Sequence, residues 1–274
     1  ALKAISCAAN RYNMYVVVNI REMEKCTGDK CPKDGYNFYN TNVAFDRTGA
    51  IVGRYRKWNL FGEISLNKTP KAELSIFKTD FDVTFGQFIC FDILFEEPTL
   101  KLIREKKITD IIFSTHWFSE LPWLIAPATQ SAWSYINNVN FLGSGYNNPA
   151  TGSTGTGLYA GKTGQIANII TEKRTNAIII GKIAKINNGK RENVPSDAIT
   201  IIYSNDEINT ITGNEPVPQL KLLADNIMPY TTKLFVPVNG TSNVTICDRG
   251  LCCEFKADTL YNEAIIKGSN VKYY

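Results

Sequence analysis

Between residues 85 and 145 the sequence alternates between buried-strand and helix patterns, and this order leaves few architectures open. Continuous apolar runs typical of buried strands occur at 85–90, 111–114 and 140–145. The segments 98–107 and 126–139 have the apolar spacing of helices, and Pro98 suits the first turn of the earlier one. The order strand, helix, strand, helix, strand predicts an α/β domain built in layers.

Further strand patterns flank this region on both sides. We expect strands at 14–20, 39–45, 50–54, 77–81, 166–170 and 177–183. Residues 1–9 have the pattern of an amphipathic helix, and residues 21–37 that of a polar loop. Residues 185–195 are polar enough to form a linker, and strand patterns dominate after them. We therefore place an α/β domain at 1–190, and a linker followed by the start of a β-rich domain at 191–274.

Neither end of the sequence resembles the boundary of a domain. The chain has no initiator methionine and begins inside the helix pattern, while the strand-like residues 271–274 end without a terminating turn. We interpret the sequence as an internal piece of a longer protein, as one chain of a processed protein, or as its ordered part. Other segments or a companion chain of the same protein are therefore expected partners.

The composition excludes several classes of protein. The 30 basic and 26 acidic residues give a net charge of +4, which provides no reason to expect nucleic acid as a partner. No stretch approaches the roughly 20 apolar residues that span a bilayer. His116 is the one histidine, so a His-rich metal site is excluded, and no cofactor is expected. Hydrophobic residues make up 44% of the 274 positions, which is ordinary for a packed core.

Seven cysteines and three glycosylation sequons indicate an oxidising compartment. The sequons begin at Asn67, Asn239 and Asn243, and the last two lie beside a cluster of three cysteines. We expect a secreted or extracellular glycoprotein that carries N-linked glycans and disulfides. A cytosolic chain with reduced thiols is the alternative.

The pairing of the cysteines is only partly indicated. If Cys90 stays free, six cysteines remain, an even number that suits disulfides. The turn at 28–29 makes a bridge between Cys26 and Cys31 the first choice. In the cluster of Cys247, Cys252 and Cys253, the two adjacent residues are expected in different bridges. Cys7, on the expected helix, is a candidate for a buried free thiol.

Cys90 is the strongest candidate for a reactive side chain. It ends a predicted strand, and α/β folds present reactive groups at the carboxyl ends of strands. A nearby cation would stabilise the reactive thiolate, and Lys57, at the end of another strand, could also stabilise an oxyanion. The alternatives are a buried small apolar side chain for Cys90 and a solvated charge for Lys57.

Two segments resemble the vanin and biotinidase branch of the nitrilase superfamily. They are Tyr-Arg-Lys-Trp-Asn-Leu-Phe-Gly-Glu at 55–63 and Cys-Phe-Asp-Ile-Leu-Phe at 90–95. Shorter stretches that agree are 15–20, Trp117 with 121–122, 131–133 with 140–142, and 245–247 with 251–253. The resemblance implies an αββα sandwich that lacks its N-terminal part here, followed by the start of a β-rich base domain.

The resemblance also implies roles for particular residues. Cys90 is the implied nucleophile and Lys57 the lysine of a Glu-Lys-Cys triad, while Glu63 matches a second glutamate that helps to hold the lysine. The backbone N–H of Phe91 would join Lys57 in the oxyanion hole. His116, together with Trp117, follows a strand end, and we expect both to line the pocket, since the triad chemistry needs no histidine.

The general-base glutamate of the family has no match in this chain, because its place lies before residue 1. Glu22 and Glu24 fall in the predicted loop and do not take its place. As an isolated polypeptide the chain is therefore expected to be inactive unless a companion segment supplies the base.

The resulting hypothesis is a secreted amidohydrolase that cleaves a secondary amide through a thioester acyl-enzyme. The small-molecule substrate would be pantetheine, giving pantothenate and cysteamine, or a biotin amide. The alternative is a non-catalytic glycoprotein that uses the fold for storage, binding or structure. A cysteine protease is disfavoured, because His116 is not in a motif of a catalytic partner. A homodimer and a membrane anchor in a further C-terminal segment are left open.

Overall fold

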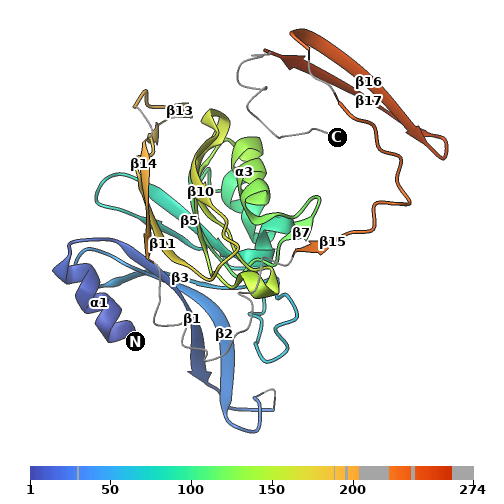
Figure 1. Ribbon diagram of the computed structural model, residues 1–274. Coiled ribbons are helices and arrows are strands. Elements are labelled where there is room, and N and C mark those ends of the chain that lie inside the picture. The colour runs from blue at the N-terminus through green and yellow to red at the C-terminus, as the bar shows by residue number, and fades with distance from the viewer. Residues whose placement is uncertain (30, 188, 195–196, 204–221, 236–237, 261–274) are drawn as a thin grey trace, which may run out of the picture. The chain divides into compact units, whose positions relative to one another are not determined.

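A computed structural model describes residues 1–29, 31–187, 189–194, 197–203, 222–235 and 238–260 (Figure 1). These residues belong to two compact units, Ala1–Ala224 and Asp225–Tyr274. The strand predicted at 271–274 lies outside the described residues, and the domain boundary predicted after residue 190 stays a prediction. Within the part that the structure describes, no helix is long and apolar enough to cross a membrane.

The first unit begins with helix α1 (Leu2–Arg11) and a three-stranded antiparallel sheet. The strands of this sheet, in order, are β1 (Val16–Lys25), β2 (Tyr36–Phe45) and β3 (Ile51–Arg56). Ala9 of α1 packs against Val43 and Phe45, so α1 covers one face of the sheet. Residues 41–45 of β2 are all buried, because the opposite face of this sheet is covered as well.

The second sheet has six strands in the order β10-β9-β8-β6-β5-β4. Its members are β4 (Ile76–Lys78), β5 (Thr84–Ile89), β6 (Asp110–Thr115), β8 (Asn140–Gly145), β9 (Thr156–Ala160) and β10 (Gln165–Ile169). The central strands β5, β6 and β8 are parallel neighbours, and the outer pairs are antiparallel. Helix α3 (Ala126–Asn137) connects β6 to β8, as expected for a parallel crossover.

The two sheets pack face to face, with the helices outside. A Cβ on Gly53 of β3 would lie 3.2 Å from Nε2 of Gln87 in β5, so the small sheet covers the Gln87 face. A Cβ on Gly143 of β8 would clash with Oε1 of Gln130 in α3, and residue 143 faces the opposite side of the six-stranded sheet from Gln87. The layers are therefore α1, small sheet, large sheet and α3 (Figure 1), which confirms the predicted αββα sandwich.

The loop predicted at 21–37 is shorter than expected. Strand β1 continues to Lys25 and β2 begins at Tyr36. The charges of Glu22 and Glu24 look like those of a loop, but both carboxylates accept hydrogen bonds from Arg56 on β3, at 2.6 and 2.7 Å. Cross-strand ion pairs thus keep a charged segment in the sheet.

The helix predicted at 98–107 is present from Pro98 to Arg104 and ends three residues earlier than predicted. A single π-helical turn, Glu96–Leu100, precedes the short α2 (Lys101–Arg104). Pro98 lies in the first turn, where a missing N–H costs no hydrogen bond, and Lys107 has a φ of 56°, which a right-handed helix does not allow. Leu102 of α2 is buried in the core, in agreement with the apolar spacing of the segment.

The predicted linker at 185–195 contains a short hairpin of β12 (Ile186–Asn187) and β13 (Lys190–Arg191). Arg191 donates hydrogen bonds to the side chain of Asn140 and to the backbone oxygen of Ala184, so this segment is attached to the sandwich. The remaining strands of the first unit are β7 (Glu120–Leu121) paired with β15 (Leu223–Ala224), and β11 (Asn176–Gly181) paired with β14 (Ala198–Tyr203).

The described part of the second unit is centred on one antiparallel hairpin. Strands β16 (Gly240–Asp248) and β17 (Leu251–Thr259) are joined by Arg249 and Gly250, which both have positive φ. Two positive φ values are typical of the tight turn that matches the twist of a hairpin. Cys247 and Cys252 face each other across the strands.

Candidate active site

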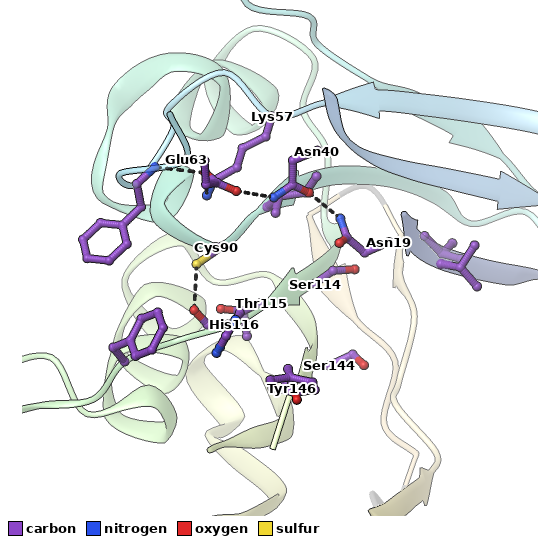
Figure 2. Close-up of a pocket in the computed structure, with 16 residues that line it drawn as sticks. Asn19, Asn40, Lys57, Glu63, Cys90, Ser114, Thr115, His116, Ser144 and Tyr146 are labelled. Atoms are coloured by element: carbon purple, nitrogen blue, oxygen red, sulfur yellow. Dashed lines mark hydrogen bonds and ion pairs between the residues drawn. The ribbon is translucent and has the colours of Figure 1, made fainter. Parts of the chain in front are cut away.

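A cavity of about 760 Å³ opens at the carboxyl ends of the parallel strands (Figure 2). Cys90 follows β5 directly, and β6 and β8 end beside it. The small sheet and the segment after β3 form the other wall. The lining residues are Val17, Val18, Asn19, Asn40, Lys57, Phe61, Glu63, Ile89, Cys90, Ser114, Thr115, His116, Phe118, Ser144, Gly145 and Tyr146. Cys90 thus lies in a cavity at the carboxyl ends of the strands, where an α/β fold is expected to present reactive groups.

Lys57 and Glu63 form a buried ion pair in this cavity. The side chain of Lys57 is 2% exposed, and its Nζ donates to Oε2 of Glu63 at 2.6 Å. The same oxygen accepts the backbone N–H of Phe61 at 3.0 Å, and Oε1 accepts Nδ2 of Asn40 at 2.6 Å. Burial acts to raise the pKa of Glu63, but these hydrogen bonds outweigh it and lower the pKa below the usual value. Lys57 is therefore a fixed buried cation, not the solvated charge considered as its alternative.

Cys90 is a free thiol held in an unusual backbone conformation. It is 8% exposed and has a φ of 50°, a region that residues other than glycine seldom occupy. Its Sγ lies 3.4 Å from the backbone oxygen of His116. Figure 2 shows the sulfur between Glu63 and His116, and Cys90 lines the same cavity as Lys57 and Glu63. The structure thus brings the three predicted catalytic residues together in one site.

A buried carboxylate fastens the segments that carry the lysine and the cysteine. Asp92 is fully buried, and its Oδ2 accepts the hydroxyl of Tyr55 at 2.8 Å and the backbone N–H of Ile89 at 3.1 Å. Its Oδ1 accepts the backbone and side-chain N–H groups of Asn59 at 2.8 and 2.9 Å. Burial raises the pKa of Asp92 despite these donors. Tyr55 and Asn59 lie on either side of Lys57 in the sequence. The side chain of Asp92 therefore holds the segment that contains Lys57 against the turn that contains Cys90.

The far wall of the cavity is aromatic and carries no net charge. The ring of His116 lies 4.6 Å from that of Phe118 and 4.8 Å from that of Tyr146. Partial burial lowers the pKa of His116, so the imidazole is neutral at pH 7. Elsewhere in the lining, the charge of Lys57 is balanced by that of Glu63, and Ser114 and Ser144 add hydroxyl groups. The lining therefore suits a ligand that is polar and uncharged.

Trp117 does not line the cavity as predicted. It is 6% exposed in the core, and its Nε1–H donates to the backbone oxygen of Leu124 at 2.6 Å. Its neighbours His116 and Phe118 line the cavity instead, because alternate residues of an extended segment point to opposite sides.

The ring of Phe91 also lies outside the described lining. It contacts the rings of Phe61 at 5.0 Å and Phe95 at 5.1 Å. The role implied for its backbone N–H stays a prediction.

Asn19, Asn40, Asp92 and Tyr146 are site residues that the sequence interpretation missed. The usable signal was the pair of asparagines at 40 and 42, within a strand that is otherwise mostly apolar. Polar side chains inside a buried strand need partners, and such positions are candidates for a site. Glu22 and Glu24 line no part of the cavity and are bound to Arg56.

The bridge predicted between Cys26 and Cys31 is present, with a Cα–Cα distance of 5.6 Å. The second described bridge joins Cys247 to Cys252. Both close loops between neighbouring strands.

Two other expectations about the cysteines are wrong. Cys253 is a free, exposed thiol, because it points to the opposite face of the hairpin from Cys252. Cys7 is free as expected, but it is exposed on α1, not buried.

The comparisons with known proteins identify the family to which this chain belongs. The family model described as carbon-nitrogen hydrolase matches residues 1–137, half of the chain, and the chain belongs to this family. The predicted relation to the vanins and biotinidase is confirmed. The chain is 41% identical over 265 residues to Vanin-like protein 3 of Drosophila melanogaster, covering 93% of this chain and 48% of that protein.

Two human proteins are similar over nearly the same range. Pantetheinase of Homo sapiens is 31% identical over 274 residues, covering 97% of this chain and 50% of that protein. Biotinidase of Homo sapiens is 31% identical over 271 residues, covering 92% of this chain and 50% of that protein. The chain thus spans about half the length of the curated relatives that it matches. Among solved structures, a member of branch 10 of the nitrilase superfamily from Saccharomyces cerevisiae has a TM-score of 0.49, at 18% identity, over 78% of this chain and 70% of that one.

Proposed function

We propose that the protein hydrolyses a linear secondary amide with Cys90 as its nucleophile. The observation that carries the proposal is the meeting of a free thiol and a buried Lys57–Glu63 ion pair in one cavity. Lysine beside a cysteine favours the thiolate, which is the nucleophilic form.

The steps follow from these groups. The thiolate of Cys90 attacks the carbonyl carbon of the amide, a C–S bond forms, and the carbonyl oxygen becomes an oxyanion. The ammonium of Lys57 and the backbone N–H of Phe91 stabilise that charge. The C–N bond then breaks, the amine takes up the proton that the Cys90 thiol gave to the general base, and a thioester remains on the cysteine. Water gives a proton to the same base and attacks the thioester, the C–S bond breaks, the acid is released, and the proton returns to the sulfur of Cys90.

None of the described lining residues is suited to act as the general base. Among the lining residues that the structure describes, Glu63 is the one carboxylate, and it is already bound to Lys57. A carboxylate in that state is a poor proton acceptor. We place the base on a glutamate of another segment of the same protein, as the family resemblance implies.

Pantetheine and biotin amides are the substrates that we propose to test. Two relatives are named pantetheinase and biotinidase, and the cavity favours an uncharged acyl group. Full-length protein is expected to hydrolyse pantetheine or biotinyl-lysine with a kcat/KM at least about tenfold above that for the same amine linked to a succinyl group, because burying the extra carboxylate is unfavourable. A purified pantetheinase serves as the positive control. If that control turns over while this protein cleaves none of the amides, the non-catalytic alternative replaces the proposal.

We propose that the protein is secreted and carries N-linked glycans. Asn243 is exposed on β16, whereas Asn67 is half-buried, with Oδ1 accepting the N–H of Phe38 at 2.8 Å. Two described disulfides support an oxidising environment. Peptide-N-glycosidase treatment of the natural protein is expected to lower its mass, and to convert Asn243 to aspartate in the mapped peptide. An unmodified Asn243 peptide together with an unchanged intact mass would contradict this proposal.

A further inference from the structure

We infer that Asn40, oriented by Asn19, is a positioning residue that keeps Glu63 ionised and directed at Lys57. The inference rests on the proposed function, because it concerns how the lysine is presented to Cys90. It adds a pair of asparagines from the small sheet to a site otherwise built on β3 and the large sheet.

Asn40 contacts both members of the ion pair. In the ladder of β2 and β3, Thr41 is opposite Arg56, which brings Asn40 beside Lys57. The backbone oxygen of Asn40 accepts the N–H of Lys57 at 2.8 Å, and its Nδ2 donates to Oε1 of Glu63 at 2.6 Å. One residue therefore fixes the lysine through its backbone and the glutamate through its side chain.

A hydrogen bond from Asn19 sets the orientation of the Asn40 side-chain amide. Nδ2 of Asn19 donates to Oδ1 of Asn40 at 2.7 Å and to Oδ1 of Asn42 at 3.1 Å (Figure 2 shows the first of these contacts). If the Asn40 amide were reversed, its oxygen would face the carboxylate of Glu63 and its NH₂ would face the NH₂ of Asn19. Both contacts would be repulsive, so the network selects the orientation that donates to Glu63.

This donor decides where the glutamate points. Oε2 of Glu63 is bound by Lys57 and by the backbone N–H of Phe61, while the described donor to Oε1 is Asn40. Without it, a half-buried oxygen would lose its partner, and the carboxylate could rotate away from the lysine. A displaced lysine would stabilise the thiolate of Cys90 less well.

The variant Asn40→Asp tests the inference through its pH dependence. The new carboxylate would face Glu63 at hydrogen-bond distance, and two such carboxylates share one proton at low pH. In that state the protonated group donates to Glu63 as the amide does, so the site is restored. At higher pH both groups are ionised and repel each other. The readout is the rate at which iodoacetamide alkylates Cys90, mapped by peptide mass, with the exposed Cys7 in the same digest as reference.

The rate for Asn40→Asp divided by that for the wild type is expected to be close to one at about pH 5 and to fall about tenfold by about pH 8. Asn37→Asp is the matched control, because it adds the same charge to β2 on the opposite face and should leave the ratio near one throughout. A ratio for Asn40→Asp that stays constant with pH, whether high or low, overturns the inference.

A second variant covers the case in which Asn40→Asp does not fold. Asn19→Ala removes the group that orients the Asn40 amide without adding charge, and it is expected to slow alkylation of Cys90 by about threefold or more at neutral pH. An unchanged rate overturns the inference. Because alkylation needs no amide substrate, the inference and the proposed function fail separately. If the alkylation ratio depends on pH but no amide is hydrolysed, the positioning role stands and the proposed function is rejected. If an amide is hydrolysed but the alkylation ratio is constant with pH, the proposed function stands and the positioning role is rejected.

Discussion

Replacing Cys90 with alanine is expected to lower amide hydrolysis by the full-length protein by at least about 10³-fold. The thiol is the group that forms the covalent bond to the acyl carbon, and Lys57 and Glu63 cannot replace it. The substitution removes one sulfur atom from the cavity wall and leaves the four donors of Asp92 in place. The measurement is the initial rate with the best amide substrate, together with a thermal melt that verifies the fold.

The matched control for this prediction is Cys7→Ala. Cys7 is also a free thiol, but it lies exposed on α1, away from the cavity lining. Its removal should leave the rate unchanged. A Cys90→Ala protein that folds and retains more than about a tenth of the wild-type rate would exclude the thioester mechanism.

Replacing Asp92 with asparagine is expected to lower the free energy of unfolding by about 1–3 kcal/mol. The amide has the same shape, but its NH₂ cannot accept a hydrogen bond. Whichever way the amide turns, it faces the backbone N–H of Ile89 or of Asn59, and that buried donor loses its acceptor. Loss of the buried charge offsets part of this cost, since burial raises the pKa of Asp92. Urea unfolding at neutral pH measures the change.

Asp82→Asn provides the comparison for the Asp92 prediction. The side chain of Asp82 is 85% exposed and pairs with Lys78 at the surface, so its change should stay within about 0.5 kcal/mol. Equal unfolding midpoints for Asp92→Asn and Asp82→Asn would show that the buried carboxylate does not fasten the lysine and cysteine segments.

The alternating core of the fold could be predicted from the sequence because its signals are local. The predicted strands at 111–114 and 140–145 correspond to β6 and β8, and the helix at 126–139 to α3. Buried parallel strands are continuous apolar runs, and the helix between them keeps its own period. The charged end of β1 was missed because its stability in the sheet comes from Arg56, 34 residues away from Glu22.

The site could be predicted only as far as the family motifs reach. Those motifs indicated Lys57, Glu63 and Cys90, which the structure brings together. Asn40 and Asp92 hold these residues through contacts between strands, such as the one from Tyr55 to Asp92 across 37 positions. Apolar periodicity indicates which face of a strand is buried, but it does not give the register that makes such partners meet.

The most direct test of the claim that Cys90 is the nucleophile is to trap the acyl-enzyme. Full-length protein is mixed with its best amide substrate, quenched in acid during turnover, and digested for peptide mass mapping. The predicted result is the mass of the acyl group on the peptide that contains Cys90, removable by hydroxylamine as expected for a thioester. An acyl group on a different residue, or turnover with no acylated Cys90, would contradict the mechanism.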